Sequence, residues 1–334
     1  MKNNIFSYAT GELSQDAFIC WLMSYAMKDA ENDVALRMCA QDFLRQFIPE
    51  LSCEENIYIS EIPQKQYKSI DVLLTVNEKY KVIIEDKTYT SEHDNQLSRY
   101  FDIVCEDYKN FTVKGVYFKT GFQSDLSAIK ESGYMYFDRQ AILKTIEKYA
   151  DKTQNRIFRD YYEYLKNLND EVEKFKTLSV EQWNWHQING FYEYAKKNNK
   201  SDMNYNYGYV HNKDGGFYGM WMYNGTYKYI QDDKYELYLQ CEYVDGKFNI
   251  CYKASAQEDS QKINREIRNK FIWKKENDKW TDIAMTNQFI KPTRFGTGKT
   301  VTLGVYSCEI HTYEDALNEI DRAIDSFKKI VENV

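Results

Sequence analysis

Hydrophobic positions in the first 50 residues recur every three to four residues, a spacing that predicts helices. In the first helical segment Phe18, Leu22 and Tyr25 share one face. A second segment has an apolar face formed by Leu36, Cys39, Phe43 and Phe47. Both helices are therefore amphipathic, and we expect their apolar faces to pack against other elements of a folded core.

Segments rich in Ile, Val and Tyr follow, and their composition predicts strands. The predicted strands lie at residues 55–62 (ENIYISEI), 69–76 (SIDVLLTV), 80–89 (YKVIIEDKTY) and 111–121 (FTVKGVYFKTG). A helix is predicted within 91–108, and a short strand followed by a helix within 133–150. The order α-β-β-β-α-β, with a further β-α, predicts an α/β (α+β) fold with a mixed sheet flanked by helices.

The character of the chain changes in its second half. Residues 154–197 are mostly helical in pattern, and about residue 203 begins a Tyr-rich region that predicts antiparallel strands. A helix at 259–272, further strands and a closing amphipathic helix at 312–334 complete the pattern. We therefore divide the chain into residues 1–175 and an α+β domain at 176–334. No flexible linker marks the division.

The tyrosines of the second half allow two interpretations. Ten of the chain's 30 tyrosines lie within residues 204–243. Exposed aromatic side chains could stack on nucleic-acid bases, or the same residues could form a β-core with their hydroxyl groups at its rim. Few arginines are interleaved with them, which favours the core interpretation.

Composition narrows the class of protein. The 334 residues are 43% hydrophobic and 28% charged, as in soluble globular proteins, and no apolar run is long enough to span a membrane. The N-terminus lacks a secretory signal, and none of the seven cysteines forms a Cys-x-x-Cys pair, so we expect a reduced, cytoplasmic protein. A net charge of −7 is unusual for a nonspecific nucleic-acid binder, but it leaves room for a local basic groove.

An apolar strand that ends in three charges is the main candidate site. In residues 80–89 the side chains of Glu85 and Lys87 leave one face and that of Asp86 leaves the other. If residues 77–79 form a three-residue hairpin loop, Asp71 lies directly opposite Glu85. Their Cβ atoms would then be about 4.5–5.5 Å apart.

Two carboxylates at that distance repel each other unless a cation lies between them. Mg²⁺, or Mn²⁺ in its place, suits such oxygen ligands and keeps several waters for a phosphate substrate. Lys87 could hold the attacking water or the phosphate, so the set predicts a phosphodiester-hydrolysis centre. The alternative is a solvated strand end with a weak surface ion pair, but Asp71 interrupts an otherwise apolar strand, which argues against it.

The sequence Asp71, thirteen further residues and then Glu85-Asp86-Lys87 resembles the PD-(D/E)XK nuclease superfamily. Ile70 stands where the motif has proline. The resemblance implies a restriction-endonuclease-like fold, DNA as the partner and a divalent metal ion held by Asp71, Glu85 and the backbone carbonyl of Asp86. It covers about the first half of the chain.

Two helices extend this resemblance. Gln96 and Tyr100 form a Gln-x-x-x-Tyr that is similar to the signature of exonuclease-type members, which implies that they approach the metal and the DNA. The segment TGELSQDAFICWL is similar to the first helix of a bacterial branch, which implies that Glu12 is a metal ligand. Alternatives stay open: Glu12 as a first-turn carboxylate that favours the helix dipole, and Gln96 and Tyr100 as ordinary helix residues.

The function implied is a Mg²⁺-dependent nuclease that acts on DNA, in phage defence or DNA processing. The C-terminal half would set substrate choice, form dimer contacts or act as a lid. The alternative is a non-catalytic module on the same fold that binds nucleic acid or protein, and a toxin or transposition component is a third. Two further features have simpler interpretations: residues 295–300 (FGTGKT) as a turn rather than a P-loop, and His93 as a loop histidine.

Overall fold

The computed structural model describes residues 3–30, 32–92, 95–212, 215–223, 225, 227–230, 233–256, 289–290, 300–306 and 308–332. The chain divides into two compact units, Met1–Asp170 and Glu171–Val334. The helix predicted at 259–272, most of the turn predicted at 295–300 and His93 lie outside the described residues. That residues 1–175 and 176–334 act as separate domains stays a prediction.

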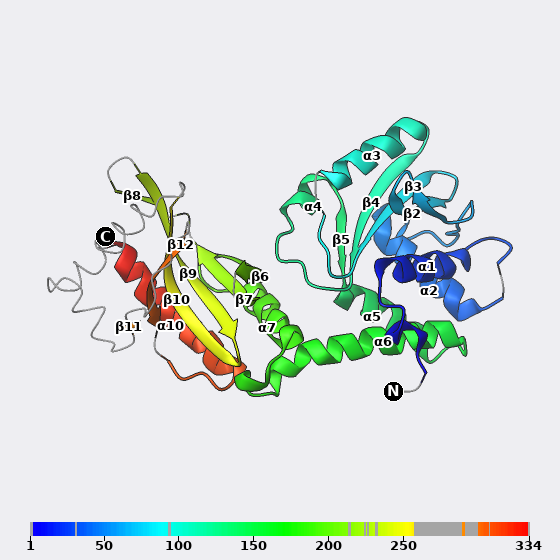
Figure 1. The fold of residues 1–334 in the computed structure, drawn as a ribbon. Coiled ribbons are helices and arrows are strands. Elements are labelled where there is room, and N and C mark those ends of the chain that lie inside the picture. Colours follow the sequence, from blue (N-terminus) through cyan, green and yellow to red (C-terminus); the bar gives the residue numbers. More distant parts are fainter. Residues whose placement is uncertain are drawn as a thin grey trace. The chain divides into compact units, whose positions relative to one another are not determined.

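A mixed five-stranded sheet forms the centre of the first unit (Figure 1). Its strands lie in the order β1 (Gln64–Tyr67), β2 (Ile70–Val76), β3 (Tyr80–Lys87), β4 (Thr112–Lys119) and β5 (Met135–Asp138). The pairs β1–β2 and β2–β3 are antiparallel, whereas β3–β4 and β4–β5 are parallel. The predicted α/β (α+β) class with a mixed sheet flanked by helices is confirmed.

Helices cover both faces of this sheet (Figure 1). The first face carries α1 (Glu12–Ser24), α2 (Val34–Phe47), α5 (Arg139–Ala150) and α6 (Arg156–Glu173), and the second carries α3 (Gln96–Asp107) and α4 (Ser127–Glu131). Val82, Ile84 and Phe118 point into the first layer, whereas Ile83 and Tyr117 point into the second. The central strands are buried on both faces, which is why their sequences are almost continuously apolar.

The β2–β3 hairpin has the predicted register. Val76 pairs with Tyr80 and Val72 pairs with Ile84, so Asp71 and Glu85 are the next pair along the ladder. The turn between the strands is three residues long, and its first two, Asn77 and Glu78, are left-handed, with φ of 51° and 54°. This register places both carboxylates on the face that α3 covers.

The strand predicted at residues 55–62 is wrong. Ile57 and Ile59 are buried, which explains the alternating pattern, but only Ile59 forms isolated bridges, to Met27 and Val76. The first strand of the sheet is instead the polar β1. It is an edge strand that pairs only with β2, and its central residues Lys65 and Gln66 are exposed, so it needs no apolar pattern.

The second unit is built on an antiparallel sheet in the order β11 (Phe289–Ile290), β12 (Thr300–Tyr306), β10 (Lys247–Ala256), β9 (Asp233–Val244), β7 (Gly215–Tyr223) and β6 (Asn204–Asn212), with β8 (Tyr227–Ile230) paired to β9. Two helices, α7 (Trp185–Lys197) and α10 (Tyr313–Glu332), pack on one face of it. The ring of Phe191 in α7 lies 5.6 Å from that of Phe248, and Phe327 in α10 stacks on Tyr252. Short 3₁₀ segments occur at Ile5–Ser7, Pro49–Leu51, Lys174–Lys176 and Val180–Gln182.

Tyrosines contribute much of the core of this second unit. The buried tyrosines of its sheet are Tyr205, Tyr207, Tyr235, Tyr243, Tyr252 and Tyr306. Among the sheet tyrosines whose side chains are described, Tyr209 is exposed, and its ring contacts those of His211 and Tyr218. These side chains support the core interpretation of the Tyr-rich region over a stacking platform.

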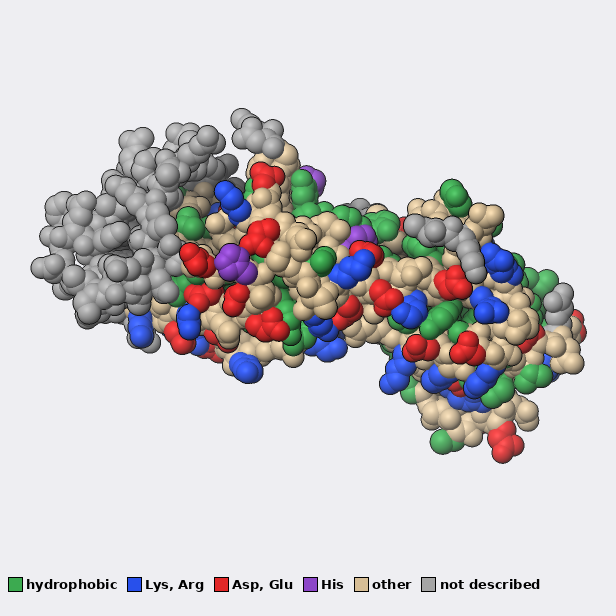
Figure 2. All heavy atoms as spheres, turned by 90° about the horizontal axis from the view of Figure 1, so that it is seen from below, with side chains coloured by type: hydrophobic (Ala, Val, Ile, Leu, Met, Phe, Trp, Pro, Cys, Tyr) green, Lys and Arg blue, Asp and Glu red, His purple; other side chains and the backbone are tan. Residues whose placement is uncertain are grey.

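The surface carries charges of both signs. Figure 2 shows lysine and arginine side chains interspersed with acidic ones on one face of the molecule. Among the described helices, none is long and apolar enough to cross a membrane. Attraction of a polyanion would therefore have to arise from local groups of side chains.

Candidate active site

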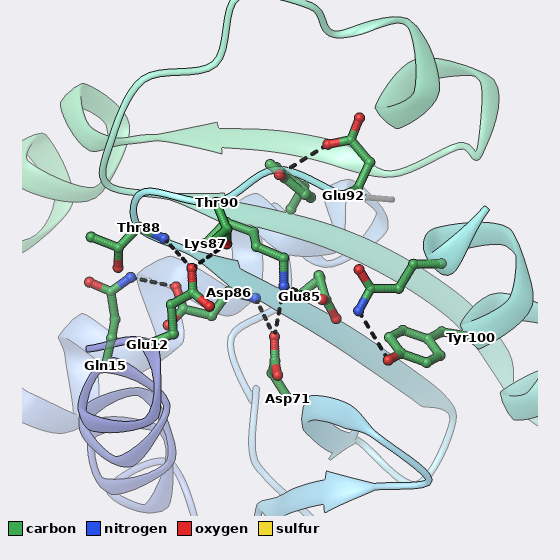
Figure 3. A network of polar contacts seen from close by, with 12 residues as sticks. Glu12, Gln15, Asp71, Glu85, Asp86, Lys87, Thr88, Thr90, Glu92 and Tyr100 are labelled. Carbon is green, nitrogen blue, oxygen red and sulfur yellow. Dashed lines mark hydrogen bonds and ion pairs between the residues drawn. The ribbon is translucent and has the colours of Figure 1, made fainter. Parts of the chain in front are cut away.

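The ends of β2 and β3 bring Asp71, Glu85 and Lys87 together (Figure 3). The Nζ atom of Lys87 lies 2.5 Å from Oε1 of Glu85 and 3.7 Å from Oδ2 of Asp71. Glu85 and Lys87 share a face because they are two residues apart on one strand, and the hairpin register adds Asp71. The cluster therefore contains two carboxylates and one ammonium group in contact.

Burial changes the proton affinities of this cluster. Burial and the charge of Asp71 together raise the pKa of Glu85 to about 8, against the opposing effect of Lys87. Burial alone would lower the pKa of Lys87, but the charges of Glu85 and Asp71 outweigh it and the pKa is raised. The Oε2 atom of Glu85 is buried and has no hydrogen-bond partner among the described residues. A negative charge here thus needs further compensation.

Asp86 points to the opposite face of the sheet, as the strand period predicts. Its carboxylate accepts a hydrogen bond from Gln15 of α1, its Oδ2 atom has no partner in the described part of the chain, and burial raises its pKa. Its backbone N–H donates to Oδ2 of Asp71 at 3.0 Å. The N–H and C=O groups of one strand residue point to the same side, so the carbonyl of Asp86 also faces the side on which Asp71 lies.

Glu12 lies in the first turn of α1 and reaches the segment that follows β3. Its Oε1 atom accepts hydrogen bonds from the backbone N–H of Thr88, at 3.0 Å, and from the hydroxyl of Thr90, at 2.6 Å (Figure 3). The carboxylate is thus fixed next to the strand end that carries Lys87, in a position that also suits the helix dipole. Its role as a metal ligand stays a prediction.

Gln96 and Tyr100 lie one turn apart on α3, on the same side of the sheet as Glu85. Gln96 donates a hydrogen bond to the Tyr100 hydroxyl at 3.0 Å, and Oε1 of Gln96 is buried without a partner among the described atoms. Tyr100 is only 3% exposed and packs in the apolar layer beneath α3. The structure places the pair beside the cluster, and their contact with a metal or with DNA stays a prediction.

Three residues near the cluster were missed in the sequence. Gln15 bonds to Asp86, and Asp16 is buried with neither carboxylate oxygen hydrogen-bonded within the described residues. Lys119 pairs in register with Lys87, is fully buried and donates to the carbonyl of Thr90. Burial lowers its pKa to about 8. Two of these residues could have been found in the sequence. Asp16 lies one helical turn after Glu12, and Lys119, like Lys87, is a charged residue that ends an apolar strand.

The donor atoms of this site fit a hard cation. Asp71 and Glu85 present carboxylate oxygens, Asp86 presents a carbonyl, and one oxygen of Glu85 is buried and unpartnered. Across the described ranges, no three His, Cys, Asp or Glu side chains are close enough together to hold a metal ion by themselves. The ammonium of Lys87 contacts both carboxylates and takes the place of a counterion. A Mg²⁺ ion, which keeps several waters, needs only one or two carboxylates.

Comparison with protein families places the first half of the chain in a known superfamily. Residues 3–176 match a family model described as the PD-(D/E)XK nuclease superfamily. No curated protein and no solved structure matches the chain. The matched region contains every residue of the cluster and both helices that flank it.

Proposed function

This chain belongs to the PD-(D/E)XK nuclease superfamily, and we propose that its first unit is a Mg²⁺-dependent nuclease that hydrolyses phosphodiester bonds of DNA. Nucleases of this superfamily typically use divalent metal ions. The observation that carries the proposal is the meeting of Asp71, Glu85 and Lys87 at the ends of two adjacent buried strands. Rigid strands hold catalytic groups more accurately than loops do.

In this proposal Asp71, Glu85 and the carbonyl of Asp86 would hold the metal ion, with Glu12 as a further carboxylate. A bound divalent ion lowers the pKa of its water and stabilises charge on the scissile phosphate. Lys87 has a raised pKa, so it acts as an ammonium group. It would orient the attacking water or bind a phosphate oxygen through its N–H donors, and it would offset the charge that develops there.

Gln96 and Tyr100 would act on the same side of the sheet. The unpartnered Oε1 of Gln96 can accept a hydrogen bond from a water or a substrate group, while the bond from its Nε2 to Tyr100 fixes its orientation. We propose the second unit as the determinant of substrate choice or of homodimer contacts. We propose that the protein acts in the cytoplasm. Its proposed role in phage defence or DNA processing rests on family membership.

A cleavage assay tests the proposal. Pure full-length protein is incubated with linear, circular and single-stranded DNA in Mg²⁺, Mn²⁺ or EDTA. We expect cleavage that requires a divalent ion. Asp71→Ala should abolish cleavage, and Lys87→Ala should lower its rate by about 10²–10³-fold, the usual cost of losing one preorganised charge-stabilising group.

Two control variants make the assay specific. Lys109→Ala and Asp102→Asn remove the same kinds of charge from exposed positions of the first unit, and both should cut as the parent protein does. Absence of cleavage with every DNA and every divalent ion would favour a non-catalytic binding module. A fully active Lys87→Ala variant would show that the lysine has no part in the chemistry.

A further inference from the structure

The five residues that follow β3, 88–92, form a segment whose backbone is fixed beside the cluster. Thr88 is held through its N–H group and Thr90 through its hydroxyl, because both donate to one oxygen of Glu12, at 3.0 Å and 2.6 Å. The carbonyl of Thr90 accepts a hydrogen bond from Lys119, a fully buried side chain of β4. The segment is thus tied to α1 on one side and to the central sheet on the other.

Two further bonds fix the far end of this segment. The hydroxyl of Tyr117, which is fully buried in β4, donates to Glu92 at 3.1 Å. The hydroxyl of Ser91 donates to the side chain of Gln123, in the loop after β4, at 3.2 Å. Hydrogen bonds to α1, to β4 and to the loop after β4 therefore hold residue 88 and residues 90–92.

Tyr89 is the large apolar side chain that this segment presents to solvent. It is 60% exposed, although the backbone on both sides of it is fixed. Its Cα atom lies within about 7.6 Å of the Cα atom of Lys87, because two consecutive trans peptides span no more than that. A single exposed aromatic ring is common on protein surfaces and needs no explanation by itself. An exposed ring on a fixed backbone beside the proposed hydrolytic centre is a different case, because it can bind a substrate group without first being ordered.

An aromatic ring in this position suits one part of a nucleic acid, the face of a base. Every base has such a face, so stacking is largely independent of sequence. In a duplex the neighbouring base pairs cover both faces, whereas the bases of a single strand can turn outward and stack on aromatic side chains. Stacking also adds affinity without positive charge, which matters in a chain whose net charge of −7 gives little general attraction to a polyanion.

We propose that Tyr89 stacks on an unpaired base next to the scissile phosphate, so that the preferred substrate is single-stranded DNA or the unpaired end of a duplex. The inference rests on the proposed function, because it is the phosphate bound at Lys87 that brings a base within reach of the ring. Tyr89 is thereby assigned to substrate binding and has no part in the proton or metal chemistry. Glu12 and Lys119 contribute by fixing the backbone that carries the ring.

Cleavage kinetics of the full chain with Mg²⁺ test this assignment. The ratio kcat/KM is measured on single-stranded DNA and on a blunt duplex of the same sequence with G·C-rich ends, and we expect the parent protein to prefer the single strand. Tyr89→Ala should lower kcat/KM on the single strand by about 5–140-fold, the usual contribution of one stacked base, chiefly through a higher KM. On the duplex the same variant should stay within about twofold of the parent, which shows that it is folded and active.

Matched variants separate stacking from a structural role. Tyr89→Phe and Tyr89→Trp keep an aromatic face, so both should retain the parent kinetics on the single strand. Tyr58→Ala is the control, because the Tyr58 hydroxyl bonds to Glu78 in the turn of the β2–β3 hairpin, at the end remote from the cluster, and this variant should cut as the parent does. A single strand that lacks one base, with the gap moved along the strand, gives a direct measurement. At one position the missing base should slow the parent protein and leave the rate of Tyr89→Ala unchanged.

The outcomes separate this inference from the proposed function. Equal loss on both DNAs in Tyr89→Ala, or a loss in Tyr89→Phe as large as that in Tyr89→Ala, shows a structural role and overturns the stacking. A parent protein that cuts DNA while Tyr89→Ala cuts the single strand equally well overturns the inference and leaves the proposed function standing. A parent protein that cuts neither DNA with any divalent ion overturns the proposed function and this inference with it.

Discussion

Gly121, just after the end of β4, is packed directly against the segment that follows Lys87. A Cβ atom at this position would lie 1.9 Å from the carbonyl oxygen of Thr88. Gly121→Ala therefore forces that oxygen to move by at least about 1.1 Å, since Cβ contacts under 3.0 Å essentially never occur. The neighbouring atoms are backbone, so no flexible side chain can absorb the shift.

This displacement should reach Glu12. The N–H of the same residue, Thr88, donates to Glu12 at 3.0 Å, and usual bonds of this kind extend only to about 3.2 Å. We expect Gly121→Ala to break this bond, and overpacking to lower the free energy of unfolding by about 1–3 kcal/mol. If Glu12 holds the metal ion as proposed, DNA cleavage should fall by about 10²-fold, the cost of misplacing a catalytic group by about 1 Å.

The stability change is measured by urea unfolding, and the local change by hydrogen exchange at the amide of Thr88. Gly208→Ala is a suitable control, because the nearest atom to its added Cβ, in the side chain of Trp221, is 3.7 Å away. Its free energy of unfolding should stay within about 0.5 kcal/mol of the parent value. If Gly121→Ala kept the parent stability and the parent protection of Thr88, the reasoning from this contact would be refuted.

Three further predictions concern the core, the thiols and a histidine. Ile84→Ala should lower the free energy of unfolding by about 2–5 kcal/mol in urea, because Ile84 is fully buried in the central strand. An aromatic disulfide reagent should label the exposed Cys53 at once and the buried Cys39 only after unfolding, since burial also raises the pKa of Cys39. The hydrogen bond and charge of Glu181 raise the pKa of His311. The protonated His311 therefore stabilises the fold fully below the unfolded-state pKa of about 6.5, and this stabilisation is lost as pH rises through the pKa of His311 in the folded protein. A proton NMR titration should show a lower His311 pKa in Glu181→Gln, and an unchanged value would contradict this pairing.

The sequence was informative wherever strand period controlled the structure. Alternation along residues 80–87 separated Glu85 and Lys87 from Asp86, and the three-residue turn set the register that brings Asp71 opposite Glu85. These are local rules, and a buried strand obeys them because a slip by one residue would turn its whole apolar set toward the wrong face. The same alternation misled at residues 55–62, because burial of Ile57 and Ile59 does not require a paired strand.

Contacts between distant elements could not be read from the sequence. Asp16 lies on a helix whose orientation over the sheet depends on tertiary packing, and its electrostatic interaction with Asp71, which helps to raise its pKa, follows only from that packing. Lys119 is brought beside Lys87 by the parallel pairing of β3 and β4, whose register no local turn defines. Lys87 and Lys119 are both charged residues at the end of an apolar run, but only the motif made Lys87 interpretable.

The turn at residues 77–79 makes the chemistry of the site sensitive to a remote part of the chain. It lies about 20 Å from Asp71 along β2, at roughly 3.3 Å per residue, and contacts none of the clustered side chains. An insertion or deletion of one residue there would turn Asp71 to the opposite face of the sheet or force the turn to bulge. Loop length, which most surface connections can vary freely, therefore constrains the position of Asp71 as strictly at this turn as a substitution within the cluster would.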